Sequence, residues 1–313
     1  MNHKDGVFEF PVSAFQILSH FVAVSGVIRH HKENGLLAKA VFFNHHRAMN
    51  ITIINDCRDA NAVSRQTART SSLLSGPVSF IGVTSDIQAA GNLIDIFDAV
   101  GGKTGVILAN IAPRNGKAKK WKNGTPFGYF WYKKVLVLAS IDGLTLSLVK
   151  KFKLTEFITV LDVSETLDQL VADDALSKNL KDSISRTQFR SYDFLPRVAA
   201  YLVKNKKLRG TRLQVKNIQD APPAIWWIDN FGNCKTTLLY KDIKDGAPLS
   251  AKFNKLPYFA RLKDVPDKAP ALISGSSGLG EKRFLEIVVQ GGNAEKEFDI
   301  SVGETISQIS ATR

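Results

Sequence analysis

The sequence predicts a two-domain α/β protein, with a three-layer N-terminal domain around a mostly parallel sheet and a small C-terminal β-barrel or sandwich. Two observations predict this fold class. Between residues 51 and about 205, apolar runs rich in Val and Ile alternate with helical patterns, which is typical of a parallel sheet covered by helices. Beyond that range, short strands are separated by Gly, Pro, Asn and Asp, which is typical of a small all-β domain.

The first domain takes its elements in the alternating order of βαβ units. We expect its strands at residues 51–54, 78–83, 106–111, 135–141 and 157–163. We expect a helix over residues 86–100, because its apolar side chains share one face, Ser85 can cap its start and Gly101 can end it. A helix at residues 195–204 closes the domain. The strands of the second domain are expected at 225–228, 235–240, 271–274 and 284–289.

The predicted boundaries divide the chain into residues 1–48, 49–205 and 206–313. All six histidines precede Met49, and a strand pattern begins directly after it. We therefore expect residues 1–48 to be an extension, or the result of a start assigned upstream of a native start at Met49; the alternative is a genuine N-terminal arm. Because residues 49–313 contain no histidine, the sequence disfavours a mechanism that needs imidazole as a base or metal ligand.

Charge and cysteine content narrow the function classes. Lys and Arg number 42 against 29 Asp and Glu, a formal charge of +13, which favours contact with nucleic acid, an acidic surface or an anionic substrate. Cys57 and Cys234 form no C-x-x-C motif, so we expect neither a disulfide framework nor a thiolate zinc site, and a reducing cytoplasm fits best. The apolar stretch 15–28 is too short to span a bilayer, so we expect a soluble protein.

The first candidate binding residue follows the first predicted strand. Ligands of open parallel sheets bind beyond the carboxyl ends of the strands, where this chain reads Asn55-Asp56-Cys57. A carboxylate at that position can accept hydrogen bonds from both hydroxyls of a ribose. The alternative is that Asp56 only caps the following turn or helix, and the spacing alone favours this alternative.

The second candidate group lies in the predicted all-β domain, where the strand at 225–228 leads into Asp229-Asn230-Phe231-Gly232-Asn233. Phe231 offers an aromatic face for stacking, Asn233 an amide that suits the edge of an adenine, and Asp229 a carboxylate for an ammonium group. The alternative is a hairpin turn in which Gly232 supplies a positive φ and the polar side chains satisfy the local backbone.

Two glycine-rich segments are rejected as catalytic motifs. Residues 101–104 lack the first glycine of a P-loop and follow a helix, and residues 275–278 do not have the G-x-S-x-G spacing of a serine hydrolase. A third segment supports a nucleic-acid-binding alternative, because basic residues from Arg114 to Lys122 precede aromatic residues at 127–132. Such a run is more often a solvated loop that leads into a buried aromatic strand.

Several short motifs follow one another in an order that points to a known family. They are Ile51-Thr-Ile-Ile-Asn-Asp56 with Arg58-Asp59, Asp86-Ile-Gln-Ala-Ala-Gly, Ile141-Asp142-Gly143-Leu144 with Leu148, Asp229-x-Phe231-Gly232-Asn233, Phe284-Leu285-Glu286-Ile287, Gly291-Gly292-Asn293-Ala294 and Val302-Gly303. Through this collinear set, residues 50 to about 310 resemble the SAM hydroxide adenosyltransferases, a group that includes fluorinase and chlorinase. The set is more specific than any single motif.

The resemblance implies a Rossmann-like first domain, a C-terminal β-barrel and a homotrimer that binds SAM between the first domain of one subunit and the second domain of its neighbour. It implies that Asp56 binds the ribose and Asp229 the methionine amino group. Phe231 and Asn233 would lie around the adenine and methionine. The implied reaction is displacement at C5′ of SAM by water or halide, with methionine leaving. SAM is then a substrate, and neither a cofactor nor a metal is implied.

The chain departs from the family's hydrolytic branch, which uses an Asp, an Arg and a His. Gly82 stands where the first aspartate is expected, and the segment 112–116, Ala-Pro-Arg-Asn-Gly, replaces the usual D-P-G-V-G. We name Asp86 and Arg114 as catalytic candidates, with Lys117 as a further cation that can substitute. The leading hypothesis is a SAM hydrolase that produces adenosine and methionine. Halogenation, a catalytically impaired SAM or adenosine sensor, and a nucleic-acid-binding protein are the alternatives.

Overall fold

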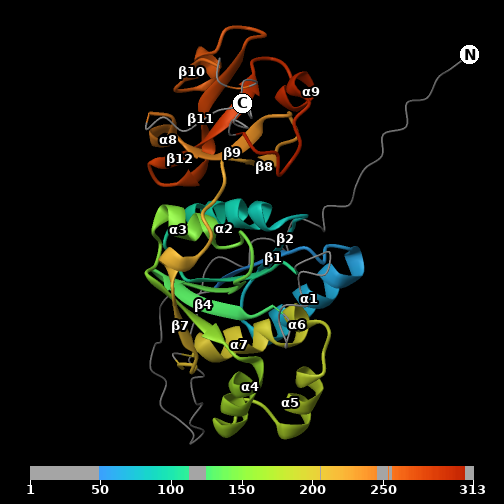
Figure 1. The fold of residues 1–313 in the computed structure, drawn as a ribbon. Helices are drawn as coiled ribbons and strands as arrows, with labels where there is room; N and C mark the ends of the chain where they lie inside the picture. The colour runs from blue at the N-terminus through green and yellow to red at the C-terminus, as the bar shows by residue number, and fades with distance from the viewer. Residues whose placement is uncertain (1–48, 113–124, 205, 245–252, 254–255, 307–313) are drawn as a thin grey trace, which may run out of the picture. The chain divides into compact units, whose positions relative to one another are not determined.

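The computed structural model describes residues 49–112, 125–204, 206–244, 253 and 256–306, all within one compact unit, residues 45–313 (Figure 1). The segment 1–48, predicted as an extension, lies outside the described residues, as do Arg114 and Lys117. In the described ranges, no helix is long and apolar enough to cross a membrane.

Described residues form a first sheet of seven strands in the order β2-β1-β3-β5-β4-β6-β7. The strands are β1 (Asn50–Asn55), β2 (Val78–Gly82), β3 (Gly105–Asn110), β4 (Phe127–Tyr132), β5 (Val135–Ser140), β6 (Phe157–Leu161) and β7 (Thr211–Gln214). β1 is parallel to β2 and β3, and β3 is parallel to β5. Because β4 is antiparallel to both β5 and β6, β6 shares the direction of the parallel group. The sheet is therefore mostly parallel, as predicted.

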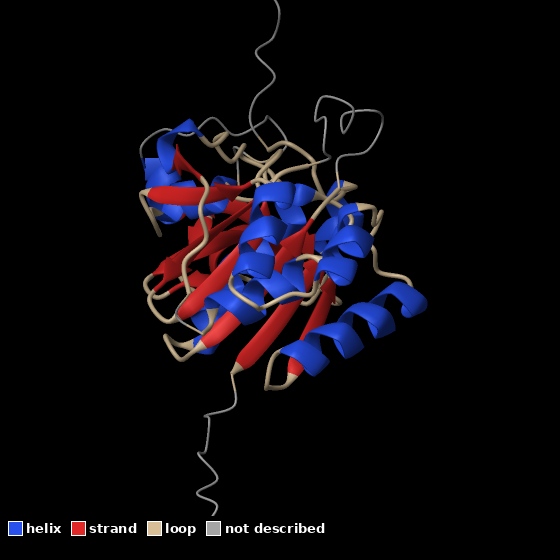
Figure 2. Cartoon of the chain, turned by 90° about the horizontal axis from the view of Figure 1, so that it is seen from below, coloured by secondary structure: helices blue, strands red, loops and turns tan. Residues whose placement is uncertain are grey.

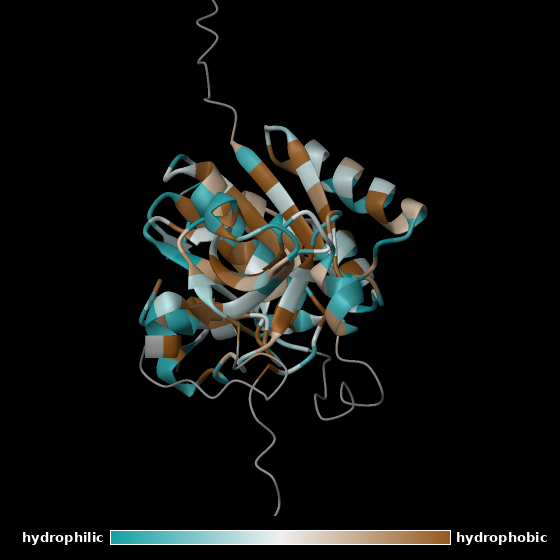
Figure 3. Ribbon diagram, turned by 90° about the horizontal axis from the view of Figure 1, so that it is seen from above, coloured by the Kyte–Doolittle hydropathy of each residue, from teal (hydrophilic) through white to brown (hydrophobic). Residues whose placement is uncertain are grey.

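Helices cover both faces of this sheet, which gives the predicted three layers. They are α1 (Ala60–Leu73), α2 (Asp86–Val100), α3 (Ser147–Phe152), α4 (Val163–Ala172), α5 (Lys178–Ser185), α6 (Arg190–Asp193) and α7 (Leu195–Leu202). Side chains alternate between the faces of a strand, so Ile54 belongs to the buried cluster with α2 and α3, while Ile53 belongs to the cluster with α4, α5 and α7. Helices stand over the strands in Figure 2, and hydrophobic positions recur along the strands in Figure 3.

The best-predicted helix is α2, whose bounds agree with the sequence. The Ser85 side chain accepts a hydrogen bond from the backbone N–H of Gln88, and Gly101 ends the helix in the left-handed conformation, with φ of 58°. These are the usual N-cap and C-cap devices of a helix. The buried residues of α2 include Ala89, Ala90 and Leu93.

Described residues form a second sheet of five strands in the order β10-β11-β12-β9-β8. Its strands are β8 (Ile225–Ile228), β9 (Cys234–Leu239), β10 (Tyr258–Phe259), β11 (Pro270–Leu279) and β12 (Lys282–Val289). Two short helices, α8 (Tyr240–Lys244) and α9 (Ala294–Phe298), accompany it. The predicted small C-terminal β domain is therefore present, and among the described strands no pairing joins β8 to β10.

The aromatic segment 127–132 forms a buried strand, β4, as the alternative to a nucleic-acid-binding surface predicted, whereas β7 and β10 lie where the sequence predicted no strand. In β4 the side chains of Phe127 and Phe130 are buried, with 2% and 4% of their surface exposed, so these rings belong to the core and do not form a base-stacking surface. β7 pairs with β6 although it lies beyond residue 205, so the first sheet extends past the predicted boundary. The division into 49–205 and 206–313 stays a prediction.

The two sheets are joined by a shared apolar cluster. Trp226 and Phe284 of the second sheet belong to the same buried cluster as α2 and α3, and the Phe284 ring centroid lies 5.3 Å from that of Phe152. Gly91 of α2 is required here, because an added Cβ would lie 2.1 Å from the Trp226 ring. The contact between α2 and the second sheet is therefore as closely packed as a domain core.

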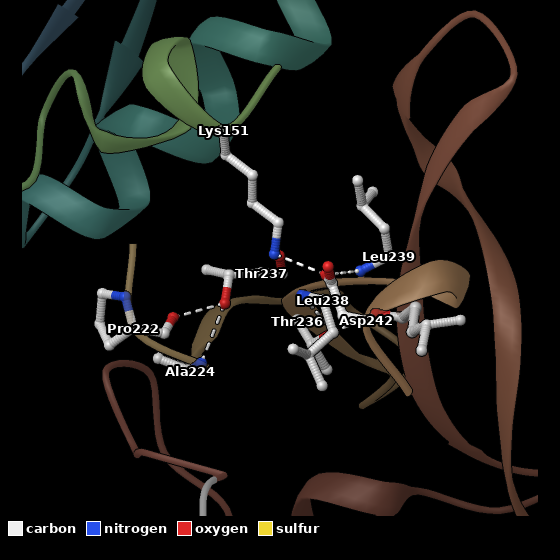
Figure 4. Close-up of polar contacts among 9 residues, drawn as sticks. Lys151, Pro222, Ala224, Thr236, Thr237, Leu238, Leu239 and Asp242 are labelled. Atoms are coloured by element: carbon white, nitrogen blue, oxygen red, sulfur yellow. Dashed lines mark hydrogen bonds and ion pairs between the residues drawn. The ribbon is translucent and has the colours of Figure 1, made fainter. Parts of the chain in front are cut away.

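Polar contacts surround this cluster. Lys151 of α3 donates to the carbonyl oxygen of Thr237 at 2.8 Å and pairs with Asp242 at 2.6 Å (Figure 4). On α2, Asp95 accepts a hydrogen bond from the backbone N–H of Gly278 at 2.8 Å. One turn later, Asp98 pairs with Arg283 at 2.7 Å. Both aspartates therefore hold the β11–β12 hairpin against α2.

Candidate functional site

The first candidate site lies at the carboxyl ends of β1 and β3. The strands β2 and β3 lie on opposite sides of β1. The connection after β1 therefore runs to one side, and the connection after β2 returns past β1 to the other side. Such a switch point opens a crevice beyond the strand ends, where open α/β sheets bind their ligands. Asp56 follows β1 directly, and its Oδ2 accepts a hydrogen bond from the backbone N–H of Ala112 at 3.2 Å. The half-buried Asp56 carboxylate thus lies at the carboxyl end of β1, beside the switch point of the sheet.

A buried amide network holds the backbone on both sides of Asp56. Asn55 is fully buried, and its Nδ2 donates to Gln66 Oε1 at 2.7 Å. Its Oδ1 accepts from the backbone N–H of Cys57 at 2.8 Å. Gln66 Nε2 donates in turn to the carbonyl oxygen of Cys57 at 3.3 Å. Sequence reasoning missed Gln66, and its only signal was an amide on the buried face of α1.

Asp86 lies at the same edge of the sheet, at the start of α2. Its Oδ1 accepts from the backbone N–H of Ile87 at 2.9 Å, and its Oδ2 accepts from the backbone N–H of Leu144 at 2.8 Å. Gly143, with φ of 72°, makes room for this carboxylate, because an added Cβ would lie 2.4 Å from Asp86 Oδ2. The contacts of Asp86 therefore hold the loop after β5 against the start of α2.

The position of Gly82, where the resemblance expects an aspartate, is filled by Arg58. An added Cβ at Gly82 would lie 2.9 Å from the Arg58 Cβ and 3.3 Å from its Cδ. A carboxylate side chain at residue 82 would displace the arginine from this place. Arg58 is exposed and follows Asp56 by two residues, so it is a candidate cation of the site that the sequence did not single out.

The second candidate group forms the turn between β8 and β9. Asp229 Oδ1 accepts from the backbone N–H groups of Phe231 and Asn233, each at 2.9 Å, and Asp229 Oδ2 accepts from Asn233 Nδ2 at 3.0 Å. Gly232 has φ of 82°, and an added Cβ there would lie 2.2 Å from Asn293 Cγ. The local-turn interpretation is therefore correct for the backbone. The same turn leaves Phe231 68% exposed, which makes its ring available for stacking.

A buried carboxylate lies behind this turn. Glu286 of β12 is only 6% exposed, and burial raises its pKa, with Lys235 opposing this effect and Asp229 adding to it. Lys235 Nζ donates to Ser277 Oγ at 2.5 Å. Gly275 leaves room for the carboxylate, since an added Cβ would lie 2.2 Å from Glu286 Oε1. The sequence signal for Glu286 was a charged residue inside an apolar strand.

The structure brings Asp56 and Asp86 to one edge of the first sheet and gathers Asp229, Phe231 and Asn233 in one turn of the second. Among the described residues, no hydrogen bond or ion pair joins these two groups. Arg114 lies outside the described ranges. Within those ranges, no group of three or more His, Cys, Asp or Glu side chains is arranged to hold a metal ion.

Two solved structures are similar to this chain, and the likeness to the first of them agrees with the α/β fold described above. A solved structure of an uncharacterized conserved protein from Thermotoga maritima aligns with a TM-score of 0.56 at 15% identity, and the alignment covers 82% of this chain and 99% of that one. A conserved hypothetical protein from Thermus thermophilus aligns with a TM-score of 0.47 at 18% identity, covering 82% of this chain and 97% of that one. The first likeness concerns the fold alone.

Sequence comparison is more specific for the second domain. No curated protein matches the chain. Residues 223–307 match the family described as the SAM hydroxide adenosyltransferase C-terminal domain. This match contains β8 to β12 and the turn with Asp229, Phe231 and Asn233. Residues 223–307 of this chain are therefore similar to the C-terminal domain of the SAM hydroxide adenosyltransferases.

Proposed function

We propose that the protein is a SAM hydrolase, which displaces methionine at C5′ of SAM with water and releases adenosine and methionine. The observation that carries the proposal is the pairing of a SAM hydroxide adenosyltransferase C-terminal domain at residues 223–307 with a carboxylate, Asp56, at the switch point of the first sheet. We also propose a cytoplasmic location, because the chain has no cysteine framework of a secreted domain.

Each proposed contact matches the chemistry of a part of SAM. The Asp56 carboxylate accepts hydrogen bonds from the two ribose hydroxyls. Asp229 pairs with the ammonium group of the methionine moiety. The exposed ring of Phe231 packs against the adenine or the methionine side chain of SAM. The Asn233 amide forms hydrogen bonds with the polar edge of the adenine. The backbone hydrogen bonds of Asp229 fix its orientation before the ligand arrives.

The displacement requires few catalytic groups from the protein. The water oxygen forms a bond to C5′ while the bond from C5′ to sulfur breaks, and the sulfur keeps the electron pair and becomes the thioether of methionine. The attacking water loses a proton to solvent or to a nearby carboxylate. Because the positive sulfonium is already a good leaving group, the protein mainly has to orient the reactants and exclude bulk water.

Asp86 and Arg114 remain the proposed catalytic residues. Asp86 is half-buried, and its two hydrogen bonds from the backbone N–H groups of Ile87 and Leu144 fix the orientation of its carboxylate. It therefore suits the role of orienting the water or receiving its proton. Arg114 belongs to the segment that replaces the family's D-P-G-V-G. Halide in place of water is the alternative nucleophile.

We further propose a homotrimer in which each site takes Asp56 from one copy and the Asp229 turn from its neighbour. The support is that each group is preorganised within its own sheet and that residues 223–307 match a family whose resemblance implies a site shared between neighbouring copies. A heterologous interface repeated around a closed ring would form the same site three times.

The proposal is tested by product analysis and by binding. Purified protein is incubated with SAM, with and without chloride, and products are identified by liquid chromatography and mass spectrometry. Adenosine and methionine are expected, whereas 5′-chloroadenosine would favour the halogenase. Asp56→Asn and Asp229→Asn should each weaken SAM binding by about 1.5 to 3 kcal/mol, because each removes a charged hydrogen-bond partner. Asp267→Asn, at an exposed position, is the matched control.

Two results would change the conclusion. SAM that binds in calorimetry but stays intact would favour the sensor, an interpretation consistent with Gly82 and with the absence of histidine from residues 49–313. Neither products nor SAM binding, in a protein that is folded by circular dichroism, would overturn the proposal.

A further inference from the structure

Three arginines meet around one tyrosine on the helical layer that contains α1, α6 and α7. Arg65 and Arg69 lie one turn apart on α1 and Arg197 lies on α7. The guanidinium carbons of Arg65 and Arg69 lie 4.7 Å and 4.5 Å from the centroid of the Tyr192 ring, and Arg69 Nη2 donates to Tyr192 Oη at 2.5 Å. Arg65, Arg69 and Arg197 are called the arginine cluster below.

The arginine cluster is not neutralised. Among the residues that the structure describes, none of its members forms an ion pair within 4.0 Å, whereas Arg261 and Arg283 each pair with an aspartate. Asp193 attracts Arg197, but one of its oxygens accepts a hydrogen bond from Thr187 at 2.7 Å. Three cations and one carboxylate leave a local excess of positive charge.

Part of the cluster is also desolvated. Arg197 Nε is buried and has no hydrogen-bond partner among the described residues. Burial lowers the pKa of the Arg197 guanidinium, and the charge of Arg69 lowers it further. Holding a buried donor beside a like charge costs free energy, so this arrangement is poorly explained by stability alone.

Stacking explains only part of the arrangement. Phe189 and Tyr192 are stacked with centroids 5.6 Å apart, and Arg65 also lies 5.2 Å from the Phe189 ring. These cation–π contacts dock α1 against α6. They account for Arg65 and Arg69, but they satisfy neither the Nε donor of Arg197 nor the excess charge.

We propose that the arginine cluster binds a phosphate group, through the guanidinium groups of Arg65, Arg69 and Arg197. The planar guanidinium presents N–H donors in a fork that fits two phosphate oxygens at once. A phosphate dianion would balance the local charge of the three guanidinium groups. Arg65 is exposed and the other two arginines are half-buried, so the group can be reached from solvent. This site includes none of the residues proposed to bind SAM, and the proposal does not depend on SAM binding.

The test measures binding of pyrophosphate and inorganic phosphate to the full chain at low ionic strength, by calorimetry. We expect binding that Arg65→Gln and Arg69→Gln each weaken by roughly tenfold or more. Arg197→Gln should have a similar effect. If Arg197→Gln does not fold, the binding measured with Arg65→Gln tests the proposal. Arg209→Gln is the matched control, because it removes the same charge at an exposed position outside the cluster.

A second arm distinguishes the sources of the phosphate. Adenosine monophosphate and a short single-stranded oligonucleotide are tested for displacement of bound pyrophosphate. Displacement by the mononucleotide supports a small phosphorylated ligand, and displacement by the oligonucleotide alone supports phosphodiesters. The proposal is overturned if pyrophosphate and phosphate do not bind, or if the cluster variants bind them as tightly as Arg209→Gln does.

Discussion

At the residue scale, the contact between Gly143 and Asp86 depends on the absence of a side chain. Gly143→Ala should lower the free energy of unfolding by more than about 1 kcal/mol, because alanine is strained at φ of 72° and its Cβ would collide with Asp86 Oδ2. Displacement of Asp86 should also slow any turnover of SAM. Chemical denaturation and product formation are the two measurements.

Gly291→Ala is the matched control for this prediction. Gly291 has φ of 66°, but an added Cβ would meet nothing within 4 Å. Both variants carry the strain of a positive φ, and only Gly143→Ala adds the collision. Equal losses of stability in the two variants would contradict the role given to the Asp86 contact.

Motifs singled out residues that the structure gathers at a strand end and in one turn, but they did not point to the hydrogen-bond partners of these residues. Asp229 and Phe231 could be singled out because strand, aspartate and glycine together predict a tight turn, and the structure has that turn. The sequence could not predict that Gln66 would bond to Asn55, since their pairing depends on how α1 packs against β1. Glu286 was missed as a buried group because burial of a carboxylate arises from tertiary packing.

At the scale of elements, Asp98 of α2 holds the β11–β12 hairpin by two contacts. Asp98 accepts from the backbone N–H of Gly280 at 2.9 Å and pairs with Arg283. The Gly280 hydrogen bond and the Arg283 guanidinium hold the pKa of Asp98 below its usual 3.8. The ionised form therefore stabilises the fold above pH 3.8, and this contribution is lost as the pH falls below that value.

Asp98→Asn should cost about 1 to 2 kcal/mol of stability at neutral pH. The difference from the unmodified protein should shrink in acid, as the wild-type carboxyl becomes protonated. Thermal unfolding followed from pH 7 to pH 3 checks both statements. Asp264→Asn, which breaks an exposed pair with Arg261, should leave the unfolding midpoint nearly unchanged. A difference that is constant over this pH range would contradict the prediction.

The elements of the first domain that could be predicted are those with clear capping residues or apolar patterns in their own sequence. α2 has caps at both ends and an apolar face, so its bounds were predicted without error. β4 was predicted only as the alternative to a nucleic-acid-binding surface, because its aromatic residues follow a basic segment. β7 was missed because only four residues, Thr211–Gln214, form it, and an exposed edge strand has no apolar run.

At the scale of the whole molecule, the proposed homotrimer makes a prediction about mixed assemblies. If a site takes Asp56 from one subunit and Asp229 from its neighbour, trimers reassembled from equal amounts of Asp56→Asn and Asp229→Asn chains should regain about a quarter of the wild-type sites. Each variant alone should have only the weakened sites, which stay largely empty at a SAM concentration that fills the wild-type sites. SAM binding before and after subunit exchange is the measurement, with exchange verified by tags of different mass.

The outcome of the mixing experiment separates two arrangements. No recovery after verified exchange would place both residues in a site within one chain. A monomer in light scattering would contradict the trimer directly. The nucleic-acid-binding alternative stays a prediction at this scale, and affinity that falls steeply with added salt would be its signature.

The packing of Trp226 against Gly91 bears on how the protein acquires its fold. The matched family domain begins at residue 223, yet Trp226 and Phe284 are buried in a cluster with α2 and α3. A C-terminal segment released alone would expose these rings to water, at a cost of several kcal/mol. The two sheets should therefore unfold in a single cooperative transition. A destabilising substitution in either sheet should lower the unfolding midpoint of both sheets equally.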